Sequence, residues 1–269
     1  MTTARKAAVL LGFLLLAGAA WAFQARRSSY MYEREMQNPA VDPVDADVPG
    51  EWAFARLRYQ SGGGRGRGRF RGSWGTDSNK AERVFTQGVR RLTRVNARSV
   101  EEIIDVDSDE VFDWPWLYAV EVGHWNLSDA QGKRLREYLD RGGFLMVDDF
   151  HGSYEWEVFM EGLRKIFPDR VIIDLPDGEP IFHVLYDLDK KFQVPGQRYI
   201  YSGQTYEQDG VEPRWRAILD EKGRVQVGIC HNMDLGDAWE WADDPQYPEA
   251  FASLAYRIGI NYLVYSMTH

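Results

Sequence analysis

The chain has 269 residues, a formal net charge of -9 and a single cysteine, Cys230. This length suits one large α/β domain with a short extension. The acidic charge argues against a nucleic-acid binder, because phosphate binding needs a basic surface. A single cysteine excludes an intramolecular disulfide.

Residues 1–22 have the pattern of a secretory signal peptide. Arg5 and Lys6 form a basic start, residues 7–20 are apolar, and residues 20–22 resemble an A-x-A cleavage site. The apolar stretch is short for a bilayer span of about 20 residues, which favours cleavage. Retention as an N-terminal anchor in the inner membrane stays open, because two arginines follow. We therefore expect an exported protein of the periplasm or cell envelope that meets a membrane only through this segment.

Residues 23–50 are polar and contain three prolines, which predicts a linker before a domain over residues 51–269. The segment Phe54–Tyr59 alternates apolar and basic residues, which is typical of a strand with one face less buried. Residues 62–72 then concentrate four arginines among glycines. This segment could contact an anion, but its composition is more typical of a solvated loop.

Helices and strands alternate after this segment. Apolar residues at helical spacing predict a helix that ends near Leu92, with Asp77 or Ser78 as its N-cap. Strands are predicted around residues 103–106 and 116–122. Ser128 and Gln131 then form a capping box, which opens a helix that stops at a pair of glycines.

The stretch Phe144–Val147 is the strongest strand signal in the chain. Its four apolar residues, bounded by glycine and by charge, predict a central strand covered on both faces. Helical spacing then predicts a helix over residues 156–167, and residues 171–173 indicate another strand. Strands that alternate with helices of this length imply βαβ units and a mostly parallel sheet.

The remainder of the chain departs from this alternation. Residues 175–213 are rich in proline, glycine and tyrosine, which predicts an irregular insertion. The segments 215–219 and 224–230 flank a turn and predict a β-hairpin. A dense polar run over residues 231–240 follows, and Pro248 opens a final amphipathic helix.

Polar side chains gather after the predicted strands. Because the carboxyl ends of parallel strands meet at one edge of a sheet, we expect these side chains to form a site there. The candidate catalytic residues are Asp149, His151, His231 and Asp234. The candidate ligand-binding residues are Asp148, Asn232, Asp237, Trp239, Glu240, His124 and His183. Successive strand residues point to opposite faces, so Asp148 and Asp149 cannot both enter one pocket, and one of them should cap a helix or anchor a loop.

Carboxylates with imidazoles permit three kinds of chemistry. They could act as a general base and its orienting partner on a water molecule. They could bind a divalent metal, although the residues do not single out one metal. They could instead hydrogen-bond a small polar ligand or a saccharide between aromatic walls. The tryptophans available for such walls are Trp125, Trp156, Trp239 and Trp241.

The motifs Gly142–Gly152 and Asn232–Glu240 resemble a bacterial family of domains of unknown function, placed among the class I glutamine amidotransferase-like proteins. The resemblance covers residues 51–269 and implies a flavodoxin-like three-layer sandwich. In true glutamine amidotransferases, a nucleophilic cysteine follows a central strand, while a histidine and a carboxylate follow a later one. Here the later strand delivers His231, but an acidic pair occupies the cysteine position. Cys230 precedes His231 within its strand, which argues against thiol-based glutamine hydrolysis.

Three hypotheses follow. The first is a hydrolase of the cell envelope that uses an aspartate with His151 and His231, with or without a metal. The second is a non-catalytic module that binds a polar ligand, a saccharide or a protein partner. In the third, Asp234 and Asp237 only brace loops by accepting backbone N–H groups.

Overall fold

The computed structural model describes residues 41–62 and 73–269. The predicted signal peptide or anchor, most of the predicted linker, and most of the arginine-rich segment lie outside these residues. Within the described ranges, no helix is long and apolar enough to cross a membrane.

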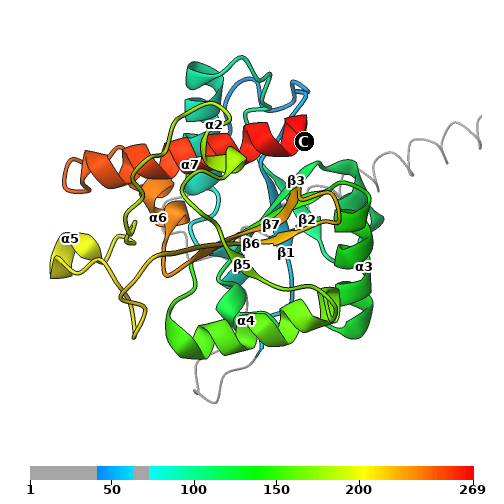
Figure 1. The fold of residues 1–269 in the computed structure, drawn as a ribbon. Helices are drawn as coiled ribbons and strands as arrows, with labels where there is room; N and C mark the ends of the chain where they lie inside the picture. The colour runs from blue at the N-terminus through cyan, green and yellow to red at the C-terminus, as the bar shows by residue number, and fades with distance from the viewer. Residues whose placement is uncertain (1–40, 63–72) are drawn as a thin grey trace, which may run out of the picture.

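The described residues form one seven-stranded sheet with the order β2-β1-β3-β4-β7-β6-β5 (Figure 1). The strands are β1 (Ala55–Arg58), β2 (Glu102–Asp105), β3 (Trp116–Val120), β4 (Phe144–Asp148), β5 (Ile173–Asp174), β6 (Arg214–Leu219) and β7 (Val225–His231). Pairing is parallel from β2 through to β7 and antiparallel for β7-β6 and β6-β5. The parallel part has the strand order of flavodoxin-like folds, with its reversal between β1 and β3. The predicted α/β fold, its mostly parallel sheet and the hairpin are confirmed.

Helices cover both faces of this sheet and make it the middle of three layers. They are α2 (Lys80–Leu92), α3 (Asp129–Asp140), α4 (Gly152–Ile166), α5 (Tyr199–Ser202), α6 (Leu235–Glu240) and α7 (Glu249–Thr268), with 3-10 turns at Ser73–Gly75, Asp109–Asp113, Val122–His124 and Pro180–Phe182. Helices α2, α6 and α7 lie on one face, and α3 and α4 on the other (Figure 1). The predicted capping box opens α3, since Ser128 and Gln131 each bond the other's backbone N–H.

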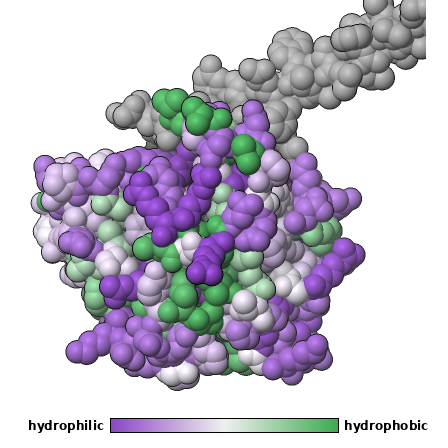
Figure 2. All heavy atoms as spheres, turned by 90° about the horizontal axis from the view of Figure 1, so that it is seen from above, coloured by the Kyte–Doolittle hydropathy of each residue, from purple (hydrophilic) through white to green (hydrophobic). Residues whose placement is uncertain are grey.

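Strand β4 lies at the centre of the sheet and is buried along its whole length. Phe144 and Met146 pack into the core beneath α2, α6 and α7, whereas Leu145 and Val147 pack into the core beneath α3 and α4. Alternate residues therefore serve opposite cores, as expected for a strand covered on both faces. Seen from above, the α2–α7 face carries mostly hydrophilic side chains around smaller apolar areas (Figure 2).

Three details differ from the sequence expectations. Arg56 was expected on a less buried face of β1, but it is fully buried and pairs with Glu82 of α2. Helix α2 begins after Asn79, so neither Asp77 nor Ser78 is its N-cap. Strand β5 continues the sheet by pairing antiparallel with β6 at the edge, not as another parallel unit. In each case a contact with a residue distant in sequence determines the observed structure, and the local sequence does not reveal that contact.

The last residues of the predicted linker pack against α2. Asp42 lies 2.7 Å from Arg83, and Asp45 lies 2.7 Å from Arg90. These ion pairs tie residues 41–50 to the helix that follows the β1 loop.

Candidate functional site

The carboxyl ends of β1, β3, β4 and β7 meet at one edge of the sheet, and an acidic residue follows each of them. Asp77 lies in the connection from β1 to α2, Glu121 follows β3, Asp149 follows β4 and Asp234 follows β7. One carboxylate oxygen each from Asp77, Asp149 and Asp234 lie within 4.8 Å of one another. This edge includes the β1/β3 strand reversal, where open α/β sheets bind ligands.

Asp149 sits at a sharp turn directly after the central strand. Its φ is 52°, a left-handed conformation that costs a non-glycine residue about 1 kcal/mol or more. Its N–H donates to the carbonyl of Met233 at 3.1 Å, which fixes the turn against the end of β7. Its Oδ1 lies 3.2 Å from Nε2 of His151, and only 8% of the residue is exposed. The turn thus aims a buried carboxylate at the sheet edge.

Asp234 lies at the start of α6, where its Oδ1 accepts the N–H of Asp237 at 2.8 Å. The irregular insertion closes over this pair of carboxylates. Gln197 donates its N–H to Asp237 Oδ2 at 2.6 Å. A Cβ on Gly196 would lie 2.4 Å from Asp234 Oδ2 and 2.7 Å from Asp237 Oδ2, so only glycine permits this close approach.

Asp77 is the member of the cluster that the sequence analysis treated only as a possible N-cap. Its φ is 61°. Arg56 holds the segment before it, because Nη1 donates to the carbonyls of Trp74 at 3.0 Å and Thr76 at 2.8 Å. Oδ2 of Asp77 is buried and has no hydrogen-bond partner among the described residues. The placement of Asp77 after β1, on the same edge as the predicted site, was the signal that could have found it.

Electrostatics make this cluster costly as a set of bare anions. Burial raises the pKa of Asp77, Asp149 and Asp234 well above the ordinary value, and neighbouring carboxylates raise each pKa further. At an effective dielectric constant of about 20, two charges 4.8 Å apart repel by about 3 kcal/mol. Three such pairs would cost about 10 kcal/mol, comparable to the whole stability of a domain. The cluster therefore needs protons or a cation.

Asp148 serves a different purpose from Asp149. Its Oδ2 accepts the N–H groups of Leu235 at 2.8 Å and Gly236 at 3.1 Å, and the hydroxyl of Tyr118 at 3.0 Å. Burial raises its pKa to about 7. Asp148 thus anchors the start of α6, the loop-anchoring role that was predicted for one member of the pair.

The two predicted catalytic histidines have different surroundings. Burial, with a contribution from His231, lowers the pKa of His151 to about 4, so its ring is neutral beside Asp149. The His231 ring packs against both Phe150 and Trp156, with each centroid 4.8 Å away. Its Nε2 lies 3.2 Å from the carbonyl oxygen of Gly152. His151 therefore contacts the acidic cluster directly through Asp149. His231 instead contacts the Gly152 carbonyl and the two aromatic rings.

His124 lies at the rim of the site, with its side chain 41% exposed. Its Nδ1 lies 2.7 Å from Glu121, which raises the His124 pKa, and its Nε2 lies 3.8 Å from Glu155. Glu155 also accepts the backbone N–H of His151 at 2.6 Å. Glu121 and Glu155 were not among the predicted site residues. The predicted strand over residues 116–122 included Glu121, whereas β3 ends at Val120 and Glu121 directly follows it.

The structure places two other predicted residues in structural positions. Asn232 links two loops, since its Oδ1 accepts the Gly152 N–H at 2.8 Å and its Nδ2 donates to the Glu212 carbonyl at 2.7 Å. Trp239 is fully buried in the core, 4.5 Å from the Phe85 ring, and cannot form a wall of a binding cleft.

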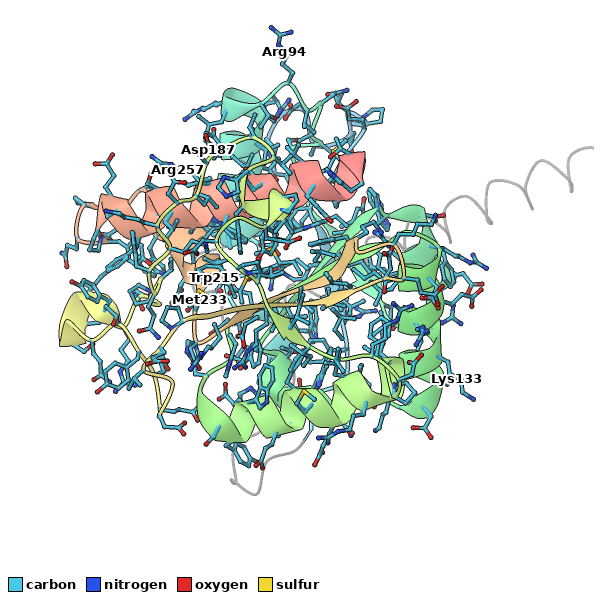
Figure 3. The ribbon with its side chains drawn as sticks, in the orientation of Figure 1. Arg94, Lys133, Asp187, Trp215, Met233 and Arg257 are labelled. Carbon is cyan, nitrogen blue, oxygen red and sulfur yellow. The ribbon has the colours of Figure 1, made fainter. Side chains whose placement is uncertain are left out.

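His183 is not brought to the acidic cluster. It contacts Asp187 at 3.0 Å and the Asp177 carbonyl at 2.8 Å. Figure 3 shows Asp187 on the same side of the sheet as Arg257 of α7, away from Met233, which directly precedes Asp234.

Comparison with protein-family models assigns the chain to a family. Residues 53–267 match DUF4159, described as a domain of unknown function. The chain belongs to this family. A comparison with curated proteins found no match.

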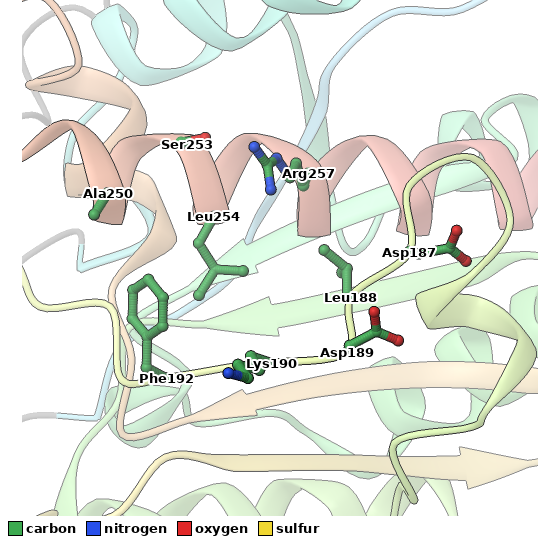
Figure 4. A pocket seen from close by; sticks show the side chains of 9 residues that line it. All are labelled: Asp187, Leu188, Asp189, Lys190, Phe192, Ala250, Ser253, Leu254 and Arg257. Carbon is green, nitrogen blue, oxygen red and sulfur yellow. The ribbon is translucent and has the colours of Figure 1, made fainter.

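A separate cavity of about 450 Å³ lies between the insertion and α7 (Figure 4). Phe192 and Leu254 lie side by side in it, with Leu188 near them and Arg257 extending from the helix. The carboxylates of the sheet edge do not line it. Its surface is open and mixed in charge, so we place the candidate site of this DUF4159 domain at the acidic edge.

Proposed function

We propose that this domain binds a divalent cation with Asp77, Asp149 and Asp234, and that it is a cation-dependent hydrolase of a polar substrate. The observation that carries the proposal is the convergence of three largely buried carboxylates from three separate connections, with oxygens within 4.8 Å of one another. A bound cation would remove the repulsion that these groups otherwise impose.

The distances suit a hard cation. Mg²⁺ and Ca²⁺ bind oxygen at about 2.0 to 2.6 Å, so ligands on opposite sides of one ion lie up to about 5 Å apart. The observed limit of 4.8 Å falls within that span. Oxygen ligands favour Mg²⁺, Ca²⁺ or Mn²⁺ over Zn²⁺ or Cu²⁺. His151, neutral and 3.2 Å from Asp149, would orient that ligand by donating a hydrogen bond.

Hydrolysis is the chemistry that this arrangement favours. A divalent cation lowers the pKa of a bound water and polarises the bond to be cleaved. The edge lies where ligands enter open α/β sheets, and Glu121 with His124 would border the entrance. His124 is the titratable group at the rim that could donate a proton to a leaving group, since Glu121 raises its pKa.

We also propose membership of the glutamine amidotransferase-like superfamily. The support is the sharp turn after β4, where Asp149 has a φ of 52°, at the place where the resemblance puts the nucleophile. Asp149 replaces that cysteine, and Cys230 is fully buried within β7. The proposal therefore keeps the scaffold of the superfamily and excludes its thiol chemistry. Residues 1–22 support the further proposal that the protein is exported to the periplasm or cell envelope.

One observation favours a second candidate function. His231 hydrogen-bonds the Gly152 carbonyl and stacks on Phe150 instead of reaching the carboxylates. An acidic site that His231 does not reach would suit a non-catalytic module that uses the cation to bind a polar or saccharide ligand.

Calorimetric titration of the full-length chain with Mg²⁺, Ca²⁺ and Mn²⁺ tests the proposal. Wild type should bind at least one of these ions, and Asp149→Asn and Asp234→Asn should each lose the ion held by Asp77, Asp149 and Asp234. Asp187→Asn is the matched control, because this exposed carboxylate lies beside α7. Chromogenic phosphate, carboxylate and glycoside esters then separate the two functions. Cation-dependent hydrolysis that Asp149→Asn removes supports the hydrolase, whereas binding without turnover of any ester supports the binding module. Absence of cation binding would refute both.

A further inference from the structure

We propose that the acidic edge holds two divalent cations bridged by Asp77, and that its substrate is a phosphate ester. This inference rests on the proposed cation-dependent function and extends it. It comes from a second group of carboxylates that overlaps the first: Asp77, Asp237 and Glu240 also have oxygens within 4.8 Å of one another.

Helix α6 supplies the second pair of ligands. Asp234, Asp237 and Glu240 are three residues apart in sequence, so they lie on one side of this short helix. Asp234 contributes to the first group, and Asp237 and Glu240 contribute to the second. One helix thus spans both groups, while Asp77 faces it from the connection between β1 and α2.

A separate observation concerns Asp77 itself. Its Oδ2 is buried and accepts no hydrogen bond from any described residue. This oxygen lies against Gly236 of α6, where a Cβ would approach it to 2.5 Å. A buried carboxylate oxygen without a donor is costly unless something satisfies it. Because Asp77 belongs to both groups, a carboxylate that bridges two cations would satisfy both of its oxygens.

The charge balance also favours two ions. Five carboxylates line the two groups, and the nearest basic side chains have other partners. Arg56 is paired with Glu82, and Lys80 is bonded to Asp243 and lies over Trp241. One divalent ion would leave three negative charges uncompensated in a largely buried site, whereas two ions would leave one.

Two cations held by these overlapping groups would suit a phosphoryl substrate. Paired cations about 3.5 to 4 Å apart bind the attacking and leaving oxygens of a phosphoryl group. Without cations, this all-carboxylate edge would repel a phosphate. In the hydrolysis, a water oxygen forms a new bond to phosphorus and the ester P–O bond breaks. The alcohol leaves with a proton that the water supplies, so no redox partner is needed.

The test measures Mn²⁺ stoichiometry on the full-length chain by calorimetry and electron paramagnetic resonance. Wild type should bind two Mn²⁺ and give a spin-coupled signal. The double variant Asp237→Asn/Glu240→Gln keeps Asp77, Asp149 and Asp234, and should bind one Mn²⁺ with an isolated-ion signal. Circular dichroism checks that both proteins are folded.

Each outcome separates this inference from the proposed function. One Mn²⁺ in wild type overturns the two-cation site and leaves the cation-dependent function standing, whereas none overturns both. Two ions that persist in the double variant also overturn the assignment to this second group. For the substrate, bis(p-nitrophenyl) phosphate or p-nitrophenyl phosphate should be hydrolysed by wild type at two equivalents of Mn²⁺, and not by the double variant. Hydrolysis of p-nitrophenyl acetate in place of both phosphates would refute the substrate class.

Discussion

Replacing Arg56 by methionine should destabilise the domain by about 4 kcal/mol. The side chains of Arg56 and Glu82 are both 0% exposed, and the guanidinium donates to the Glu82 carboxylate. Removing one partner of such a pair leaves a buried, uncompensated charge, which costs about 3 to 5 kcal/mol. The substitution also removes the donor that Arg56 provides to the carbonyls of Trp74 and Thr76.

Arg58 provides the matched control on the same strand. Its partner is Asp105, and the two side chains are 22% and 32% exposed. Because solvent screens such a pair, Arg58→Met should cost about 1 kcal/mol or less. The double variant Arg56→Met/Glu82→Met should recover most of the loss, since apolar side chains can replace a buried ion pair at little cost. The coupling energy in this cycle should be about 3 kcal/mol.

Urea unfolding followed by tryptophan fluorescence gives these free energies, because the chain has 10 tryptophans. A loss in Arg56→Met no larger than in Arg58→Met would refute the reasoning. A double variant as unstable as the single one would do the same. A second readout is cation affinity, which should fall in Arg56→Met because Arg56 holds the segment that carries Asp77.

Three further predictions concern the site. Burial raises the pKa of Asp148 from 3.8 to about 7, so the folded protein retains a proton that the unfolded chain releases. The contribution of this group to the free energy of unfolding therefore falls as pH rises from about 4 to 7. In EDTA, the free energy of unfolding of Asp148→Asn should rise by about 4 kcal/mol relative to wild type across that range, as measured by urea unfolding. A difference that does not change with pH would contradict this. Gly196→Ala should lower Mn²⁺ affinity at least tenfold, or about 1.4 kcal/mol, because its Cβ would meet Asp234 Oδ2 at 2.4 Å. An unchanged affinity in calorimetry would contradict this, because it would show that the insertion can move away from Asp234. Cys230→Ala should leave ester hydrolysis unchanged, since burial raises the pKa of this thiol well above its ordinary value; loss of activity in a folded variant would restore thiol chemistry.

Local signals were enough to predict most of the architecture. The capping box at Ser128, the apolar run of β4 and the turn between β6 and β7 each act within a few residues. Their structural effect does not depend on distant partners, so periodicity and turn chemistry identify them. The carboxyl-edge argument also placed Asp149 and Asp234, because strand ends in a parallel sheet share one edge.

The missed features depend on partners far away in sequence. Arg56 was expected to be less buried because charged residues usually face solvent, but Glu82 neutralises it inside the protein. Trp239 was expected in a cleft, and the aromatic core around Phe85 buries it instead. The orientation of His231 depends on Trp156, a residue of α4. None of these contacts leaves a local signature in the sequence.

The hydrogen bonds at the acidic edge explain why side chains with acceptor oxygens are needed there. They do not explain why those side chains are charged carboxylates. Asp234 Oδ1 accepts the Asp237 N–H, and Asp237 Oδ2 accepts the Gln197 N–H. An asparagine at either position could accept the same bond without the repulsion between like charges. Bracing of loops alone would therefore favour amides, which are less costly to bury. Under the proposed function the carboxylates do what amides cannot, because their charge would attract a cation strongly enough to offset their own burial. This difference is why we favour cation binding over a purely structural cluster, and why aspartate-to-asparagine variants are the decisive test: in EDTA they should stabilise the domain, and with Mn²⁺ present that order should reverse.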